Sequence, residues 1–457
     1  MSRHTDLAQT FEILQAQIEA PWLGEVFLPP REFGLMTGLY SILVMGEEGS
    51  GKTALEIQLK ACTSQKKIPD LLIVSWRPQL PVTPISSEQV AEIFMSQAMD
   101  CLSFAFLQTL AGAPTLFSSA PAWARDFMTW FIQRFLQGDR EYHLSRLAGD
   151  AAPHGLDVAS HILSETPRLL FPQTPPTSIL PHLTEAIKAL GFRGIWVFID
   201  GLDTLFRRSP DHLERFLIDF LSTLDYFEDP AFVFKIIVSR DLGLHLQTTR
   251  GVVTRRFKTY HLKWQEQELI RMVEKRLGFT LEREKVLLNQ LCKDEAWFNW
   301  LKKYAGNSPR GWLDLTRPIL EAYLEKGKGL SKTEWLDIYR QTPPPLRLDL
   351  NVGDVFIGYG KMEISGIGYK LLAYLYENRH RSCTKSELYY RAHKGLVHEP
   401  LTSTDPGWED IAIWEGPLDT AVYRLRQLVE WDPRKDTAPL YIISEKGRGQ
   451  IHLENTA

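Results

Sequence analysis

The chain of 457 residues has only four cysteines, and none of them is paired by spacing. They are Cys62, Cys101, Cys292 and Cys383. We therefore expect neither a disulfide framework nor a zinc site, and the expected compartment is a reducing cytoplasm. A long uninterrupted apolar run is missing as well. The most apolar stretch, Cys101–Phe117, contains Gln108, Gly112 and Pro114, so a core helix is expected there rather than a membrane span.

The N-terminus lacks a basic segment followed by an apolar core, so we expect no secretory signal. An excess of charge is also missing, since the formal net charge is only -4. Binding to nucleic acid or to a membrane surface would therefore need a local patch, and no membrane partner is expected. The length exceeds what one hydrophobic core usually holds, which predicts two or three domains.

The most specific motif is "GEEGSGKT", Gly46–Thr53, which matches the phosphate-loop pattern. An apolar run, Ser41–Met45, precedes it, and helical periodicity follows, so strand, loop and helix come in the required order. Glycines let backbone N–H groups converge on phosphate oxygens, and the helix N-terminus adds its positive dipole. The predicted nucleotide contacts are Gly46, Glu47, Glu48, Gly49, Ser50, Gly51, Lys52 and Thr53.

Lys52 is expected to reach the β- and γ-phosphates of ATP, and the Thr53 hydroxyl to hold Mg²⁺. The metal then needs a carboxylate at the end of a second buried strand. "GIWVFIDGLDTL" supplies one, because the apolar run Ile195–Ile199 is followed by Asp200. Asp203 is a candidate for polarising the attacking water, although an Asp after a strand is as often a turn or cap residue. The predicted catalytic set is Lys52, Asp200 and Asp203.

A third strand is predicted in "AFVFKIIVSR", with Ser239 and Arg240 at its end. Either side chain could sense the γ-phosphate, whereas Arg240 could equally be a solvated strand end. Two segments of helical period follow, Trp264–Leu277 and Gly306–Leu320. Arg310, near the start of the second, is predicted to return to the nucleotide from a helical lid.

The motifs "GEEGSGKT", "VFIDGLD", "KIIVSR" and "GNSPR" occur in that order between Phe33 and Lys326. In this the chain resembles the signal-transducing P-loop ATPases with numerous domains (STAND) and their AAA+ relatives. The resemblance implies that ATP is a conformational switch that promotes homo-oligomerisation and that slow hydrolysis resets it. Thr204 stands where that family commonly has Glu, which fits slow turnover. An arginine finger acting between subunits could be any one of five residues, and the sequence does not choose between them: Arg207, Arg208, Arg250, Arg255 and Arg256.

The C-terminal part begins after Pro343, Pro344 and Pro345, which predict a stiff extended linker. Beyond it we predict a β-hairpin between Asp354 and Met362, three helices and a terminal hairpin. Thr384 is the predicted N-cap of the second helix, with Glu387 at the capping-box position. These elements in this order indicate a winged helix-turn-helix.

Over Leu346–Glu454 the chain resembles the C-terminal output domain of OmpR/PhoB-type response regulators. The resemblance rests on "AVYRLRQLVE", as recognition helix, and on "YIISEKGRGQIHL", as wing. It implies contact with double-stranded DNA, the helix in the major groove and the wing near phosphates. The predicted DNA contacts are Arg424, Arg426, Lys446 and Arg448. Two departures are Gln450, where an aromatic residue is usual, and the long acidic segment His398–Glu415.

The predicted fold class is α/β: a P-loop NTPase parallel-sheet core with a helical insertion and a helical lid, followed by a small α+β winged-helix domain. The helical insertion has apolar stripes that core packing explains, while partner recognition stays open. The predicted segments are a lead-in (1–32), the core (33–260, insertion about 84–190), the lid (261–340), the linker (341–346) and the winged helix (347–457).

Two functions remain open from the sequence. The first is an ATP-controlled switch whose oligomers present winged helices to DNA, in transcriptional regulation or in a phage-defence or mobile-element system. The second is an ATPase scaffold that binds a protein effector without nucleic acid. The acids near the recognition helix keep the second open, because DNA affinity normally needs an electropositive face.

Overall fold

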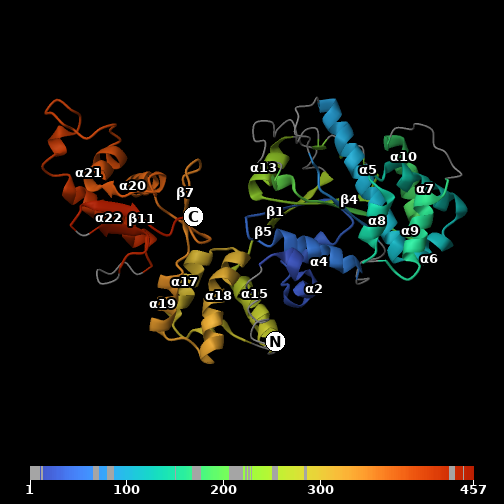
Figure 1. Cartoon of the computed structure of the whole chain (residues 1–457), viewed down its shortest axis with the longest axis horizontal. Helices are drawn as coiled ribbons and strands as arrows, with labels where there is room; N and C mark the ends of the chain where they lie inside the picture. Colours follow the sequence, from blue (N-terminus) through green and yellow to red (C-terminus); the bar gives the residue numbers. More distant parts are fainter. Residues whose placement is uncertain are drawn as a thin grey trace. The chain divides into compact units, whose positions relative to one another are not determined.

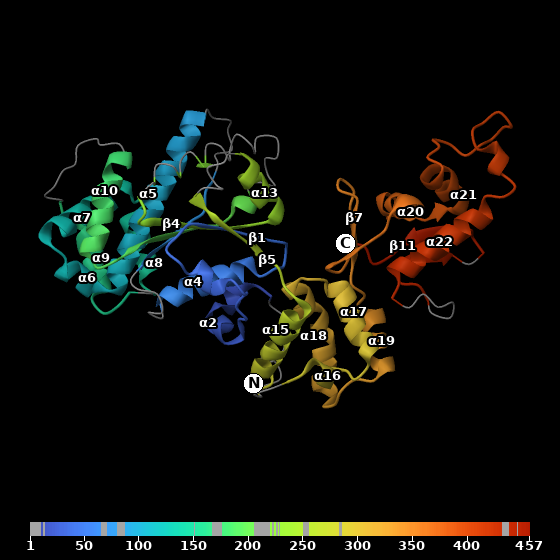
Figure 2. The same ribbon diagram turned by 180° about the vertical axis from the view of Figure 1, so that it is seen from behind.

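The computed structural model describes most of the chain in two compact units, Ala20–Lys263 and Met1–Glu19 with Trp264–Ala457. The described residues are 11, 14–64, 71–79, 87–149, 151–166, 176–204, 220–221, 224, 227, 229–249, 256–282, 286–431, 438–445 and 447–457. Figures 1 and 2 show the chain from opposite sides.

The first unit is built on a parallel sheet of five strands in the order β2-β3-β4-β1-β5. Its strands are β1 (Ile42–Gly46), β2 (Leu71–Trp76), β3 (Gly194–Ile199), β4 (Phe232–Val238) and β5 (Lys258–Leu262). The three central strands are buried along their whole length, as expected for apolar strands covered on both faces, whereas β5 is an edge strand with exposed positions. Because β4 lies between β1 and β3 and all three strands are parallel, their C-terminal ends lie next to one another at one edge of the sheet.

Alternate residues of each strand enter two different cores, because strand side chains point to opposite faces. Leu43 and Met45 of β1 pack with the helices inserted between β2 and β3, and Ile42 and Val44 pack with Leu55 of α4 on the other face. Figures 1 and 2 show the inserted helices grouped to one side of the sheet. The helices of this unit are α3 (Phe33–Met36), α4 (Lys52–Ser64), α5 (Ser87–Gly112), α6 (Pro114–Ser119), α7 (Ala122–Phe135), α8 (Arg140–Leu147), α9 (Gly155–Ser164), α10 (Pro176–Ala189) and α13 (Arg240–Thr249). Helix α2 (Ala16–Val26) contributes residues to both units.

The longest of these helices, α5, contains a stretch, Gln89–Gly112, that is long and apolar enough to cross a membrane. Half of its most apolar window is buried inside the chain, against the sheet and the other inserted helices. A core helix passes the same test of length and composition, so this stretch is weak evidence for a span.

One charged residue lies inside the sheet. Lys235 of β4 is fully buried, and its Nζ donates to the carbonyl oxygens of Met36, Gly38 and Tyr40 at 2.8, 2.9 and 3.2 Å. It also lies over the Trp196 ring, 4.3 Å from the centroid. These contacts fasten the connection between α3 and β1 to the centre of the sheet. Burial lowers the pKa of the Lys235 ammonium to about 7.

The second unit combines a helical lid with the C-terminal domain. The lid helices are α15 (Glu266–Thr280), α16 (Leu288–Leu291), α17 (Glu295–Ala305), α18 (Pro309–Lys326) and α19 (Lys332–Gln341). Capping boxes at Gln265/Glu268 and Ser331/Glu334 start α15 and α19, and Asp294 and Ser308 cap α17 and α18. The local sequence therefore fixes where the lid helices begin.

The described residues of the C-terminal domain form two three-stranded antiparallel sheets and several helical segments. Its strands are β6 (Leu346–Asp349), β7 (Asp354–Ile357), β8 (Gly360–Met362), β9 (Cys383–Thr384), β10 (Ile442–Glu445) and β11 (Gln450–Leu453). Its helices are α20 (Gly366–Glu377), α21 (Lys385–Glu387) continued by a π-helical turn η2 (Leu388–His393), a short 3₁₀ turn η3 (Trp408–Asp410) and α22 (Glu415–Val429). The predicted fold class is confirmed.

Candidate nucleotide site and nucleic-acid interface

The phosphate loop joins the C-terminal end of β1 to the N-terminus of α4. Gly49 and Gly51 have φ of 75° and 89°, in the left-handed region that glycine adopts without strain. A Cβ on Gly46 would lie 2.4 Å from the Ser50 Oγ and 3.2 Å from Leu262, so that position has no room for a side chain. The sequence motif thus folds as the strand, turn and helix N-terminus that a phosphate group requires.

Lys52, the first residue of α4, folds back over this loop. Its Nζ donates to the carbonyl oxygens of Gly46 at 2.9 Å and Glu47 at 3.1 Å. The ammonium is therefore held above the loop, among the backbone groups that a phosphate would approach. Thr53 is exposed beside it, at the start of the helix.

Asp200 lies directly after β3, at the same edge of the sheet as the phosphate loop. One carboxylate oxygen accepts from the backbone N–H of Gly201 at 2.7 Å, and the other from Arg77 Nη2 at 2.5 Å. The hydrogen bond and the charge of Asp200 raise the pKa of Arg77. Sequence reasoning missed Arg77, because only the pairing of β2 with β3 places the end of "LLIVSWR" beside Asp200.

Asp203 is tied to the neighbouring strand β4. Both of its carboxylate oxygens accept from the backbone N–H of Ser239, at 2.8 and 3.1 Å. The Ser239 hydroxyl in turn accepts from Leu242 at 3.4 Å, within the first turn of α13. The structure therefore joins Asp203, the candidate for polarising water, directly to Ser239, a candidate γ-phosphate sensor.

Arg240 begins α13, and its guanidinium lies 3.4 Å from the Glu47 carboxylate of the phosphate loop. Both side chains are largely exposed, so this contact contributes little stability. Arg310 belongs to the other unit, where its Nη2 lies 3.5 Å from the Leu14 carbonyl oxygen. Its predicted role towards nucleotide stays a prediction.

Oxygen ligands suited to Mg²⁺ are present in the Thr53 hydroxyl and the Asp200 carboxylate.

Of the arginine-finger candidates, Arg207, Arg208, Arg250 and Arg255 lie outside the described residues. Arg256 is described, and it donates to the carbonyl oxygens of Leu224 and Phe227. It thus closes a loop of its own unit. No group of three or more His, Cys, Asp or Glu side chains that could hold a metal ion occurs in the part of the chain that the structure describes.

No protein-family model matches the chain, and no curated protein matches it either. Solved structures that resemble this chain include the Aeropyrum pernix ORC2 protein in its ADP form, at 12% identity with a TM-score of 0.36, covering 93% of this chain and 91% of that one. The Aeropyrum pernix ORC1 protein in complex with DNA is 12% identical, with a TM-score of 0.36, and covers 94% and 90%. Cdc6p from Pyrobaculum aerophilum is 10% identical, with a TM-score of 0.32, and covers 97% and 91%.

At these TM-scores the likeness carries no argument about function. The described sheet, the phosphate loop and the C-terminal domain by themselves define a P-loop nucleotide-binding fold followed by a winged helix. This agrees with the coarse part of the sequence prediction, a P-loop nucleotide-binding core followed by a winged-helix domain.

The predicted DNA contacts on α22 differ sharply from one another. Arg424 is exposed, and it has no hydrogen-bond or ion-pair partner among the described residues. Arg426 is half-buried and donates to the Ile442 carbonyl oxygen at 3.0 and 2.7 Å, which joins α22 to the wing strand β10. Arg448, at the wing tip, lies 3.5 Å from Glu445, and Lys446 lies outside the described residues. Of the three predicted cations that the structure describes, Arg424 is therefore the most available to a phosphate.

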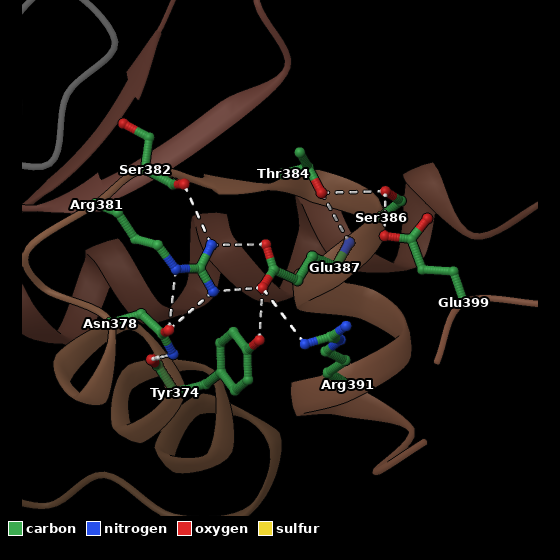
Figure 3. Close-up of polar contacts among 9 residues, drawn as sticks. All are labelled: Tyr374, Asn378, Arg381, Ser382, Thr384, Ser386, Glu387, Arg391 and Glu399. Atoms are coloured by element: carbon green, nitrogen blue, oxygen red, sulfur yellow. Dashed lines mark hydrogen bonds and ion pairs between the residues drawn. The ribbon is translucent and has the colours of Figure 1, made fainter. Parts of the chain in front are cut away.

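The segment before α21 is held by a polar cluster that Figure 3 shows. The Thr384 hydroxyl accepts from the Glu387 N–H at 3.1 Å, as expected of an N-cap. The Glu387 carboxylate accepts from Arg381 at 2.5 and 3.0 Å and from the Tyr374 hydroxyl at 2.6 Å. The Arg381 bond holds the pKa of Glu387 down at about 2. The cluster fixes α21 against α20 and uses Arg381 internally.

The acidic segment before α22 is ordered by its own contacts. The Asp405 carboxylate accepts from the N–H groups of Leu401 and Thr402, each at 2.7 Å, and Asp410 pairs with Lys394 at 2.6 Å. Lys385 pairs with Asp419 of α22 at 2.6 Å. Two cations, Lys385 and Lys394, are thus neutralised within the domain. This reduces the positive field that DNA would meet.

Proposed function

We propose that this chain is an ATP-binding switch whose nucleotide state controls DNA binding by its C-terminal winged helix. The observation that carries the proposal is that Lys52, Asp200 and the Asp203–Ser239 contact lie at the same edge of the parallel sheet, where β1, β3 and β4 end. Strands β1, β3 and β4 bring these residues there from distant parts of the sequence. The same chain ends in a winged helix with an exposed arginine on α22.

In this proposal, the loop N–H groups and Lys52 bind the β- and γ-phosphates, and Thr53 and Asp200 supply the oxygen ligands of Mg²⁺. The bound metal would neutralise charge on the phosphate oxygens. Asp203 orients or polarises the attacking water, and Ser239 and Arg240 read the presence of the γ-phosphate. With Thr204 in place of a second carboxylate, turnover is slow, as in a STAND-type switch.

Nucleotide state would further control homo-oligomerisation, so that several winged helices meet DNA together. Multivalency then compensates for a weakly basic module. The setting would be transcriptional regulation or a phage-defence or mobile-element system. Arg424 and the wing tip supply the phosphate contacts, in the manner of an OmpR/PhoB-like output domain.

The test is fluorescence anisotropy of a labelled random duplex with ATP, with ADP and without nucleotide, at two salt concentrations. We expect binding that ATP strengthens and salt weakens, because phosphate contacts release counterions. Lys52→Ala should abolish the effect of ATP on duplex binding. Lys60→Met, two turns further along α4, should keep that effect. The absence of duplex binding in every nucleotide state, with ATP still bound, would refute the DNA part.

A second candidate is an ATPase scaffold whose winged helix binds a protein effector. It is favoured by the segment before α22, where Val397, Leu401 and Ile413 are 76%, 83% and 64% exposed among acidic residues. An interface of this kind would be much less sensitive to salt than phosphate contacts are. The anisotropy series therefore separates the two candidates.

A further inference from the structure

The recognition helix α22 and the wing strand β10 form one rigid piece. Arg426 bonds the Ile442 carbonyl oxygen and also the Ser444 hydroxyl at 2.8 Å. One helical turn later, the Glu430 carboxylate, only 4% exposed, accepts three backbone N–H groups. These are the N–H groups of Leu440 and Tyr441 at 2.9 Å each and of Ile442 at 3.3 Å. Such charge-assisted bonds are stronger than neutral ones, so helix and wing keep a fixed geometry.

The C-terminal end of α22 is capped by a helix of the lid. Lys303 Nζ of α17 donates to the Leu428 carbonyl oxygen at 3.3 Å, and the Tyr304 hydroxyl donates to that of Val429 at 3.2 Å. The last carbonyls of a helix have no partner within it, and a cation there also suits the helix dipole. Burial raises the pKa of Tyr304, so its phenol stays protonated at neutral pH and donates this hydrogen bond.

A second contact joins the same end of α17 to the turn between β7 and β8. The Tyr359 N–H donates to the Tyr304 carbonyl oxygen at 2.8 Å. A Cβ on Gly360 would lie 1.9 Å from the Lys303 carbonyl oxygen. Backbone therefore lies directly on backbone here, and position 360 accepts only glycine without a shift of the turn or of α17.

The linker between lid and winged helix is also pinned. The Tyr441 hydroxyl, fully buried, donates to the carbonyl oxygen of Pro344 at 2.7 Å. The rings of Tyr304 and Tyr339 stack at 6.3 Å, and Trp431, which follows α22, lies 6.1 Å from Tyr304. Two carbonyl groups of the proline run are thus bonded to the winged-helix domain, that of Pro344 by Tyr441 and that of Pro345 by the Gly358 N–H at 2.9 Å, which opposes movement as a free hinge.

We propose that α17 transmits the nucleotide state to the DNA-binding surface, with Lys303 and Tyr304 as the residues that position α22 and its wing. A displacement of the lid is then passed through these contacts to the C-terminal end of α22 and to the wing strand, where it loosens or tightens the hydrogen bonds. This inference rests on the proposed function. Because such coupling is reciprocal, DNA would change nucleotide affinity by the same factor.

The test compares the variants Tyr304→Phe and Gly360→Ala with the wild type and with the control variant Lys302→Met. Tyr304→Phe keeps the ring and removes the hydroxyl, which donates to Val429 and also interacts with the Tyr339 hydroxyl. Gly360→Ala forces the β7–β8 turn off α17. Lys302 is the matched control, since it is on the same helix but pairs with Glu266 of α15 at 2.7 Å. Hydrogen exchange of α22 and β10 is measured with ATP and with ADP, beside nucleotide affinity and duplex anisotropy.

We expect exchange in α22 to differ between ATP and ADP in the wild type and in Lys302→Met. In Tyr304→Phe the difference should shrink about threefold or more, as one lost buried hydrogen bond would cause, with nucleotide affinity unchanged. Gly360→Ala should act in the same direction, and Tyr304→Phe carries the test should Gly360→Ala fail to fold.

The proposal is overturned when the wild type shows the same exchange of α22 with ATP and with ADP. It is equally overturned when Tyr304→Phe retains the full wild-type difference. A nucleotide-dependent change in exchange without any duplex binding would support the transmission while refuting the DNA part of the proposed function. The two failures are thus distinguishable.

Discussion

The Asp203 carboxylate accepts the backbone N–H of Ser239 through both of its oxygens, at 2.8 and 3.1 Å. The contact joins the turn after β3 to the end of β4. It gives Asp203 a positioning role that exists beside any role in activating water. The two roles respond differently to substitution.

Asp203→Asn keeps an acceptor for the Ser239 N–H, whereas Asp203→Ala leaves that group unpaired. We expect Asp203→Ala to lower the free energy of unfolding by about 1–3 kcal/mol and Asp203→Asn to change it much less. Thermal unfolding measures this difference. If Asp203 also activates water, Asp203→Asn should still lose ATP turnover. Equal turnover of Asp203→Asn and wild type would leave Asp203 with the positioning role alone.

In the proposed site, Arg77 would compete with Mg²⁺ for the Asp200 carboxylate, because its guanidinium holds one of the two oxygens at 2.5 Å. We expect Arg77→Met to raise the apparent affinity for Mg²⁺ severalfold in the presence of ATP. The measurement is a Mg²⁺ titration of the binding of a fluorescent ATP analogue. Arg140→Met, on an inserted helix, is the control. A weaker or unchanged Mg²⁺ affinity in Arg77→Met would contradict this competition.

Lys235 should make the free energy of unfolding depend on pH in the alkaline range. Its folded pKa is lowered to about 7 by burial, so above that pH the unfolded chain binds more protons than the folded one. The contribution of Lys235 to stability should therefore be complete above the ordinary lysine pKa of about 10.4 and be lost as pH falls towards 7.

The size of this contribution is on the order of 3 kcal/mol, reduced by the carbonyl acceptors that favour the ammonium form. Chemical denaturation between pH 7 and 10 measures it, with Lys235→Met as the comparison. The variant should show a flatter rise of stability with pH than the wild type. Parallel pH profiles for the two proteins would refute the shift.

Arg424 and Arg426 lie two positions apart on α22 and should behave oppositely. Arg424→Met should reduce the slope of log affinity for duplex against log salt by about 1, with no change in thermal stability. Arg426→Met removes the bonds to Ile442 and should lower the free energy of unfolding by about 1–3 kcal/mol. Anisotropy and thermal unfolding of both variants check this. A salt slope that depends on Arg426 more than on Arg424 would reverse the assignment.

The sequence by itself determined the local parts of this protein. The phosphate loop, the caps of the lid helices at Asp294, Ser308 and Ser331, and the order of the wing elements follow from spacing and side-chain type. Such signals act within a few residues, so the chain states them directly. For the same reason the fold class could be predicted.

Only the tertiary structure decided which side chains meet. The pairing of β2 with β3 brought Arg77 to Asp200, and the position of β4 brought Ser239 to Asp203. Arg424 and Arg426 are both arginines of the predicted recognition helix. Because two positions span more than half a turn of an α-helix, only Arg426 faces the wing strand β10. These contacts join residues far apart in sequence, whose distance depends on strand order and helix packing, so periodicity and spacing along one chain could not reveal them.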